Sequence, residues 1–268
     1  MKAILFILVL LLTSGDSWAN EQSSTSQKKH ETGAGEVFNP VKDVQLAINE
    51  TLTKASENNR LGLIILGANW CHDSRGLAAN IESTEIKTYI EQNYQLLYVD
   101  VGYLDQIKPA ITHLSVPVIY ATPTVLIVEP SSLEILNRDN MNLWRDAAKV
   151  SKQQVLDYFT GYVDVQKTVD PLIDRQKLSS LNKKIQKFER RLARRLYQGF
   201  AMISPLLSDR VAGKEVKGFE QSWKAFSAFR YQVSSDVEQL RKQAIAIASS
   251  KSETKSLVFP EYEQQSWE

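Results

Sequence analysis

The stretch LGLIILGANWCHDS, residues 61–74, decides the fold. Leu61 to Leu66 form an apolar run of strand length with β-branched residues at its centre, which predicts a buried strand. Gly67 to Asn69 break this run, and a helical pattern follows over residues 75–93. The stretch is therefore predicted to be a strand, a tight turn and a helix N-terminus, with the chain's single cysteine, Cys71, at the turn.

The predicted position of Cys71 bears on its chemistry. A thiol at a helix start meets backbone N–H groups that have no intrahelical partner, and it meets the positive end of the helix dipole. Both favour the thiolate, which is the nucleophilic form of cysteine. The alternative is a buried, inert thiol, which is common for free cysteine.

Two motifs carry a resemblance to a known family. The residues Trp70-Cys71-His72-Asp73-Ser74 resemble the WCxxC motif of the thioredoxin superfamily, with serine in place of the second cysteine. Downstream, residues 121–128 (ATPTVLIV) resemble that family's cis-proline loop and the strand after it. Over residues 37–163 the resemblance implies a thioredoxin-like α/β fold with a single-cysteine CxxS site.

The resemblance also implies roles for the motif residues. Cys71 takes the part of the first cysteine, which attacks a substrate disulfide. Ser74 cannot resolve the mixed disulfide, because a hydroxyl does not replace a thiolate in exchange, so an external thiol must complete the cycle. Ser74 can still donate a hydrogen bond to the Cys71 sulfur, and His72 adds a switchable positive charge. Ile65 stands where many thioredoxins carry a buried acid, which argues against ordinary dithiol reductase activity.

The other half of the site is Thr122-Pro123. By resemblance, this peptide bond is cis, lies beside Cys71 and presents backbone to an extended substrate, while Trp70 provides an apolar wall. The alternatives are a trans proline at a strand start and a tryptophan that only packs.

Two other chemistries can be weighed. Cys71, His72 and His113 include ligands for a soft metal such as copper, but no repeated ligand spacing supports a site. A Cys-His-Asp hydrolase is disfavoured because adjacent residues at a helix start point in different directions. We expect no metal and no cofactor.

The N-terminus predicts export. Lys2 precedes an apolar run, residues 3–12, that is too short to span a bilayer, and Ser17 and Ala19 form a small-x-small cleavage pattern. A signal peptide cut after Ala19 places the protein in a bacterial periplasm or outside the cell; the alternative is an uncleaved anchor. In such compartments a lone cysteine is either kept free for chemistry or paired between molecules.

Composition and patterning predict the organisation of the chain. A chain of 268 residues with 43% hydrophobic and 24% charged residues can form a core, and a net charge of +1 names no partner. The predicted regions are a signal peptide (1–19), a disordered linker (20–36), a thioredoxin-like domain (37–165), an α-helical hairpin (166–250) and a loose tail (251–268).

Periodicity predicts the elements within these regions. Helices are expected over residues 38–59, with Asn39-Pro40 at its start, and over 75–93, 109–114 and 155–163; strands over 61–66, 96–101, 124–128 and 133–136. Two long helices follow, with breaks expected at Ser204-Pro205, Gly213 and Gly218.

The first long helix is strongly basic. Only Glu189 offsets its positive residues, which are Lys183, Lys184, Lys187, Arg190, Arg191, Arg194 and Arg195. Such a helix can bind acidic lipid, nucleic acid or an acidic partner, or it can be a solvated face opposite a core stripe. Export argues against nucleic acid.

These observations predict an exported thioredoxin-like protein that performs thiol-disulfide exchange, or isomerase-like chemistry, through a mixed disulfide on Cys71. Its partners are then protein or small-molecule thiols and disulfides. The alternative is a non-catalytic binding or scaffold module that uses the cis-proline groove or the basic helical hairpin.

Overall fold

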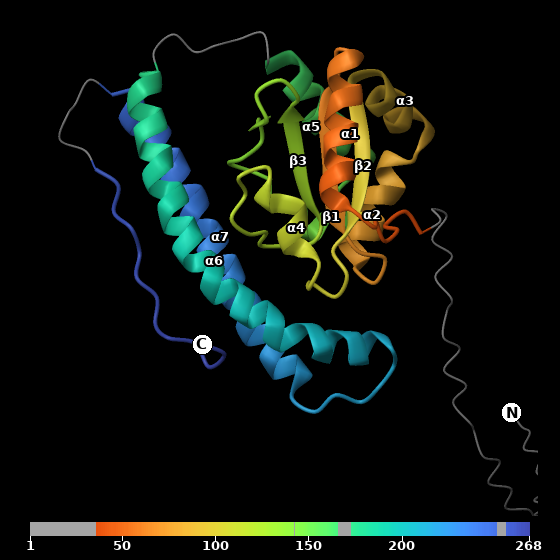
Figure 1. The fold of residues 1–268 in the computed structure, drawn as a ribbon, viewed down its shortest axis with the longest axis vertical. Coiled ribbons are helices and arrows are strands. Elements are labelled where there is room, and N and C mark those ends of the chain that lie inside the picture. The colour runs from red at the N-terminus through yellow and green to blue at the C-terminus, as the bar shows by residue number, and fades with distance from the viewer. Residues whose placement is uncertain (1–35, 142, 166–172, 251–255) are drawn as a thin grey trace, which may run out of the picture. The chain divides into compact units, whose positions relative to one another are not determined.

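The computed structural model describes residues 36–141, 143–165, 173–250 and 256–268 (Figure 1). The predicted signal peptide, residues 1–19, lies outside the described residues, as does the predicted linker except for Glu36. In the described part of the chain, no helix is both long enough and apolar enough to cross a membrane.

A four-stranded mixed sheet, in the order β2-β1-β3-β4, organises the described residues of the first half of the chain. Its strands are β1 (Leu61–Gly67), β2 (Tyr94–Asp100), β3 (Thr124–Glu129) and β4 (Glu134–Ile135). Strand β1 pairs parallel with β2 and antiparallel with β3, and β4 pairs antiparallel with β3. The predicted α/β class, with a late antiparallel pair, is confirmed.

Strand β1 is buried along its whole length because both faces of the sheet are covered. Successive side chains alternate between two apolar clusters: Ile64 and Leu66 join one, and Leu63 and Ile65 join the other. The first cluster includes residues of α1 (Val44–Glu57) and α4 (Ile107–Thr112). The second includes residues of α2 (His72–Ile81), α3 (Thr84–Asn93), the 3₁₀ segment η1 (Leu143–Lys149) and α5 (Lys152–Val165).

The predicted start of the first helix is wrong. Helix α1 begins after Asp43, whose Oδ1 accepts a hydrogen bond from Leu46 N at 2.9 Å, and not at Asn39-Pro40. Phe38 is instead a core residue of the second cluster, and the Asn69 side chain bonds both its backbone N–H and its C=O, at 3.2 and 2.8 Å. Because Phe38 is buried against the sheet and bonded to Asn69, the helix begins further along the chain, at Val44.

The helix predicted over residues 75–93 is two helices. Helix α2 ends at Ile81, and α3 begins after Ser83. Ile81 and Ile86 both join the second cluster, and they are five residues apart. A continuous helix places core residues three or four apart, so the five-residue step requires the break.

Two long helices, α6 (Arg175–Val211) and α7 (Phe219–Ala248), run side by side (Figure 1). The break expected at Ser204-Pro205 is wrong, because Pro205 lies inside α6 and Ser204 Oγ donates to Phe200 O at 2.7 Å. Gly213 and Gly218 form the turn, as expected, with φ of +79° and +76°. At Gly199 the helices approach so closely that a Cβ atom would lie 2.2 Å from the Phe226 ring.

The end of the chain is not a loose tail over residues 256–268. Trp267 lies edge-on to Phe226 and Phe229, with ring centroids 5.4 and 5.8 Å apart. Arg195 of α6 pairs with the Glu268 carboxylate at 2.7 Å. Aromatic residues spaced among the polar ones therefore give this segment enough apolar surface to pack on α6 and α7.

Candidate functional site

Cys71 lies where β1 gives way to α2. It is the N-cap of α2, with φ −82° and ψ 121°. Its N–H donates to Ala68 O at 3.1 Å, and its C=O accepts from Arg75 N at 3.1 Å, so the turn is held from both sides. The side chain is half-buried. Cys71 is therefore not the fully buried thiol of the alternative interpretation.

Thr122 is the immediate neighbour of the Cys71 sulfur. The thiol donates to the Thr122 carbonyl oxygen at 3.3 Å, and the Thr122 hydroxyl donates to the sulfur at 3.4 Å. The Thr122–Pro123 peptide bond is cis, and Pro123 is buried. The structure thus brings together the cysteine at the end of β1 and the turn that precedes β3.

Ser74 does not occupy its expected place. Its side chain is buried, and its oxygen accepts a hydrogen bond from Ala68 N at 3.3 Å. In the described part of the chain, the sulfur receives its hydrogen bond from Thr122 and not from Ser74. One turn into α2, Ser74 faces the end of β1, where a Cβ on Gly67 would lie 2.8 Å from Ser74 Oγ. Ser74 therefore stabilises the turn.

The remaining predicted site residues flank Cys71. His72 is the exposed first residue of α2. Trp70 is half-buried: its Nε1 donates to Gly102 O at 2.8 Å, in the loop after β2, and its ring packs against the first apolar cluster. Trp70 therefore packs on the first cluster and is bonded to the loop after β2.

Asp73 has a partner that could not be predicted from the sequence. Its Oδ1 accepts a hydrogen bond from Ala148 N at 3.0 Å and so joins the first turn of α2 to η1. The acidic residue in a predicted first helical turn was a signal, but its partner is remote in sequence and could not be inferred.

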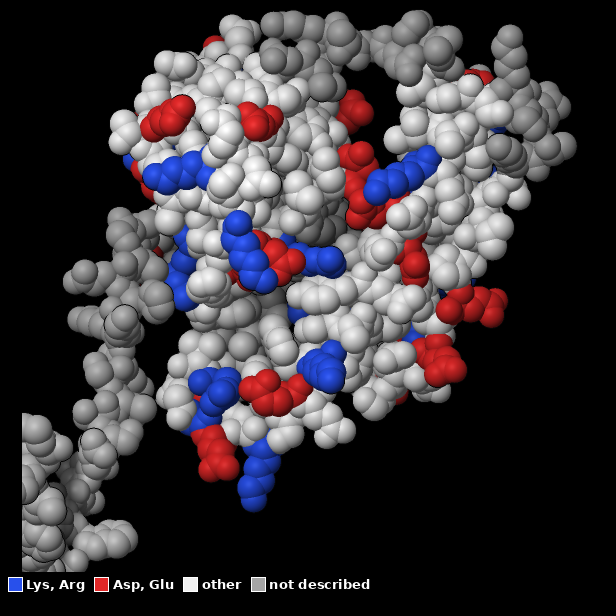
Figure 2. All heavy atoms as spheres, turned by 180° about the vertical axis from the view of Figure 1, so that it is seen from behind, with Lys and Arg blue, Asp and Glu red and all other residues white. Residues whose placement is uncertain are grey.

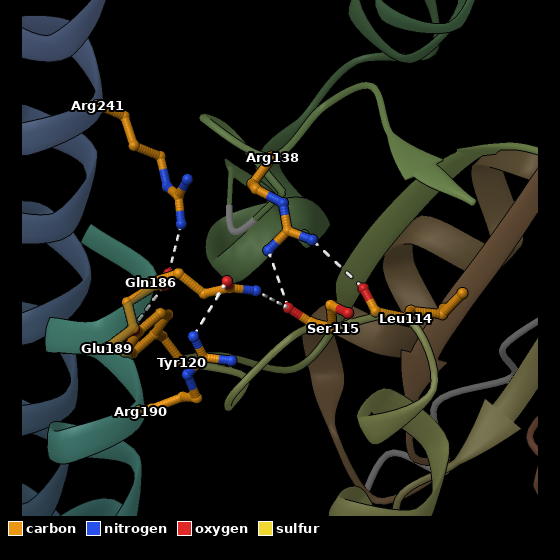
Figure 3. A network of polar contacts seen from close by, with 8 residues as sticks. All are labelled: Leu114, Ser115, Tyr120, Arg138, Gln186, Glu189, Arg190 and Arg241. Atoms are coloured by element: carbon orange, nitrogen blue, oxygen red, sulfur yellow. Dashed lines mark hydrogen bonds and ion pairs between the residues drawn. The ribbon is translucent and has the colours of Figure 1, made fainter. Parts of the chain in front are cut away.

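Helix α6 contacts the loop that leads to Thr122 (Figure 3). Tyr120 donates its hydroxyl hydrogen to Glu189 Oε1 at 3.2 Å, and Gln186 donates to Ser115 O at 3.3 Å. Glu189 is completely buried and also pairs with Arg241 of α7, so it does not offset the basic residues of α6 as the sequence suggested. Arg138, in the segment between β4 and η1, also donates to Ser115 O, at 3.3 Å.

The basic residues of α6 border a groove of about 690 Å³. Its lining consists of Lys184, Lys187, Phe188, Arg190, Arg191, Arg194 and Phe259. None of the ion pairs recorded within the described residues involves these five cations. On the face shown in Figure 2, by contrast, positive and negative side chains are interspersed.

The metal alternative gains no support from the geometry. Within the described ranges, no group of three or more His, Cys, Asp or Glu side chains is placed to hold an ion. His113, the third residue considered, is exposed at the end of α4.

Comparisons with known proteins give one similar structure to report. No protein-family model and no curated protein matches the chain. A solved structure of a disulphide isomerase from Xylella fastidiosa Temecula1 aligns with a TM-score of 0.44 and 20% identity. The alignment covers 48% of this chain and 97% of that chain.

Proposed function

We propose that the chain is an exported, thioredoxin-like protein that carries out thiol-disulfide exchange with one cysteine. The observation that supports this most is the setting of Cys71: a half-buried thiol at the N-cap of α2, with its sulfur 3.3 Å from Thr122 O. Unpartnered N–H groups and the helix dipole favour a negative charge at that position.

Thr122 replaces Ser74 as the proposed hydrogen-bond donor. When Cys71 loses its proton, the Thr122 hydroxyl continues to donate to the sulfur, and this bond is then charge-assisted. The Thr122 carbonyl loses its donor at the same moment. That carbonyl can then accept an N–H from an extended substrate backbone, as in strand addition.

The proposed reaction balances without a second protein cysteine. The Cys71 thiolate attacks one sulfur of a substrate disulfide; a new S–S bond forms, the substrate S–S bond breaks, and the electron pair leaves on the other substrate sulfur. An external thiolate then attacks the mixed disulfide, is itself oxidised to a disulfide, and releases Cys71 as thiolate. In isomerase-like chemistry the freed substrate thiolate makes this second attack, and no net oxidation occurs.

Alkylation kinetics test this proposal. Wild-type Cys71 is expected to react with iodoacetamide at mildly acidic pH faster than the thiol of a short cysteine peptide, and Cys71→Ser provides the blank. Incubation with oxidised glutathione should then add one glutathione to Cys71, visible by mass spectrometry. Alkylation of Cys71 at a rate no faster than that of the peptide thiol would contradict the proposed thiol-disulfide exchange.

The alternative is a non-catalytic binding module, and one observation favours it. The groove along the basic part of the proposed α-helical hairpin combines five cations with the rings of Phe188 and Phe259, which suits an acidic peptide with apolar side chains. Capture of such a peptide should survive Cys71→Ser and be lost in the triple variant Lys187→Gln/Arg191→Gln/Arg194→Gln. If the triple variant still captures it, the groove is not the binding surface.

A further inference from the structure

Arg230 of α7 is a buried cation that the sequence analysis did not single out. Its side chain is 3% exposed, and its Nη2 donates to Ser227 Oγ at 3.1 Å. Its Nε is buried and has no hydrogen-bond partner within the described residues. None of the ion pairs recorded there includes it. A buried charge is costly unless an anion pairs with it, so this guanidinium calls for a partner.

Aromatic rings surround Arg230 and account for part of its stability. The guanidinium carbon lies 4.9 to 5.7 Å from the ring centroids of Phe226, Trp223, Tyr231 and Phe200. Cation–π contacts of this kind stabilise a desolvated guanidinium, but they supply no hydrogen-bond acceptor in the plane of its N–H groups. We call these four rings the Arg230 cage. They hold the side chain in place but carry no negative charge to neutralise it.

Contacts of α6 and α7 bring the helix pair that carries these rings against two segments that are bonded to the turn at Cys71 or lead to its neighbour Thr122. On one side, Tyr197 donates to Pro117 O at 3.2 Å, in the loop that leads to Thr122. On the other side, the Arg145 guanidinium of η1 lies 5.2 Å from the Tyr231 ring centroid, and η1 is joined to α2 through Asp73. The helices therefore contact the loop before Thr122 and η1, which is bonded to the first turn of α2.

The electrostatics agree with this placement. Burial lowers the pKa of Arg230 to about 10, and the negative charges of Tyr231 and Cys71 act in the opposite direction. Tyr231 lies on the same helix as Arg230, and its side chain is exposed. Cys71 therefore lies within electrostatic range of Arg230, and no hydrogen bond between the two side chains is recorded within the described residues.

We propose that Arg230 is the counter-charge of the Cys71 thiolate, a positioning residue that the helix pair supplies to the reactive turn. It does not touch substrate; it stabilises the deprotonated sulfur after the thiol proton leaves to solvent. A mixed disulfide neutralises the sulfur and leaves Arg230 unpaired again, so the pairing also makes Cys71 a better leaving group in the second exchange. This inference rests on the proposed function, because it assigns a role at the same cysteine.

Charge-changing variants of Arg230 test the pairing. In Arg230→Gln, the ultraviolet absorbance of the thiolate at mildly acidic pH should fall, and alkylation of Cys71 should slow about tenfold. Arg230→Lys should retain most of both signals. Lys242→Gln removes a charge from the same helix at an exposed position, where Lys242 pairs with Glu238, and it should change neither. A folded Arg230→Gln protein with wild-type thiolate absorbance would overturn the pairing.

A second test keeps Arg230 intact and so does not depend on folding of that variant. Cys71→Asp places a permanent anion at the N-cap, and Cys71→Asn places a neutral cap of similar quality. With Arg230 beside it, the Asp variant should melt about 3 °C above the Asn variant. Ser83, the N-cap of α3, gives the matched control: Ser83→Asp minus Ser83→Asn measures the helix-dipole effect alone. An Asp–Asn difference at Cys71 no larger than at Ser83 contradicts the pairing.

The two proposals fail in different ways. A thiolate signal that depends on Arg230, in a protein that never forms a mixed disulfide with oxidised glutathione, overturns the function and leaves the pairing. Efficient mixed-disulfide formation that is unchanged in Arg230→Gln overturns the pairing and leaves the function.

Discussion

Two buried arginines on α7 make an instructive comparison. Arg230 and Arg241 are 3% and 6% exposed. Arg241 has a carboxylate partner, Glu189 of α6, which also accepts the Tyr120 hydroxyl hydrogen. Arg230 has aromatic rings, one serine and an unpartnered Nε. The two residues share a helix, a burial and a charge, and they differ in what neutralises that charge.

The Arg241 pair is structural, whereas the pair that we propose for Arg230 depends on the charge of the Cys71 sulfur. The pair of Glu189 with Arg241 does not involve the cysteine, so we call it the permanent pair; it joins α6 to α7. The partner that we propose for Arg230 is a sulfur whose charge disappears when it is protonated or enters a disulfide. Changes at the two arginines should therefore affect different measurements, stability in one case and thiol reactivity in the other.

The largest expected effect comes from breaking the permanent pair. Arg241→Ala leaves the Glu189 carboxylate buried without its cation, and this should lower the free energy of unfolding by about 3–5 kcal/mol. Urea unfolding followed by circular dichroism measures the loss. The double variant Glu189→Gln/Arg241→Met removes both charges and should lose less than the single one. A loss under about 1 kcal/mol for Arg241→Ala would show that the pair is not structural.

Crowding the contact that holds the Arg230 cage should have the next largest effect. In Gly199→Ala, the new Cβ would lie 2.2 Å from the Phe226 ring, so the helices must shift, at about 1–3 kcal/mol of stability. Gly161→Ala is the control, because nothing lies within 4 Å of a Cβ at that helical position. The control should be neutral or stabilising by about 0.5–1 kcal/mol. Equal effects at the two glycines would contradict the close packing.

Two further substitutions distinguish the role of Thr122, which donates a hydrogen bond to the Cys71 sulfur, from that of Ser74, which stabilises the turn. Thr122→Val removes the hydroxyl that donates to Cys71 and should slow alkylation about tenfold or more, since a hydrogen bond to a charged group contributes about 1.5–3 kcal/mol. Ser74→Ala removes the acceptor of Ala68 N, so it should lower stability by about 1 kcal/mol and leave the alkylation rate unchanged. The reverse outcome would restore the role that the sequence analysis gave to Ser74.

The smallest expected effect concerns the contact between α6 and the loop before Thr122. Burial raises the pKa of Tyr197 to about 12, above its usual value of 10.0. The folded state therefore keeps this proton where the unfolded state loses it, and the contribution of Tyr197 to stability should decline as pH rises from 10 to 12. Tyr197→Phe should make the alkaline decline measured by urea unfolding shallower. An unchanged slope would show that Tyr197 does not contribute to it.

The strand, the turn at Cys71 and the turn at Pro123 were predicted well from the sequence because their signals are local. The apolar run of β1, the break after Gly67 and the turn at Pro123 depend on residues next to one another, and the structure places Cys71 and Thr122 in contact as the resemblance implied. Ser74 was assigned to the sulfur because a motif does not specify which way a side chain one turn along the helix points. Its burial under β1 decided that question.

Arg230 was missed because an arginine in a helix is expected on the solvent side. The signal was nevertheless present: the apolar stripe of α7 runs through Phe226 and Val233, and Arg230 fills the gap between them at helical spacing. One of the rings around it comes from α6, and the partner that we propose for it lies at Cys71; only the tertiary structure brings these together. The same holds for Glu189, whose sequence neighbours are basic but whose partner lies on another helix.

The central claim is that Cys71 is a nucleophile activated by its setting, and its exchange rate tests that claim most directly. The measurement is the rate at which oxidised glutathione adds to Cys71 at mildly acidic pH, followed by intact-protein mass spectrometry beside a cysteine peptide. The account predicts one added glutathione, formed several-fold faster on the protein than on the peptide. A protein that reacts at the peptide's rate or more slowly would contradict it.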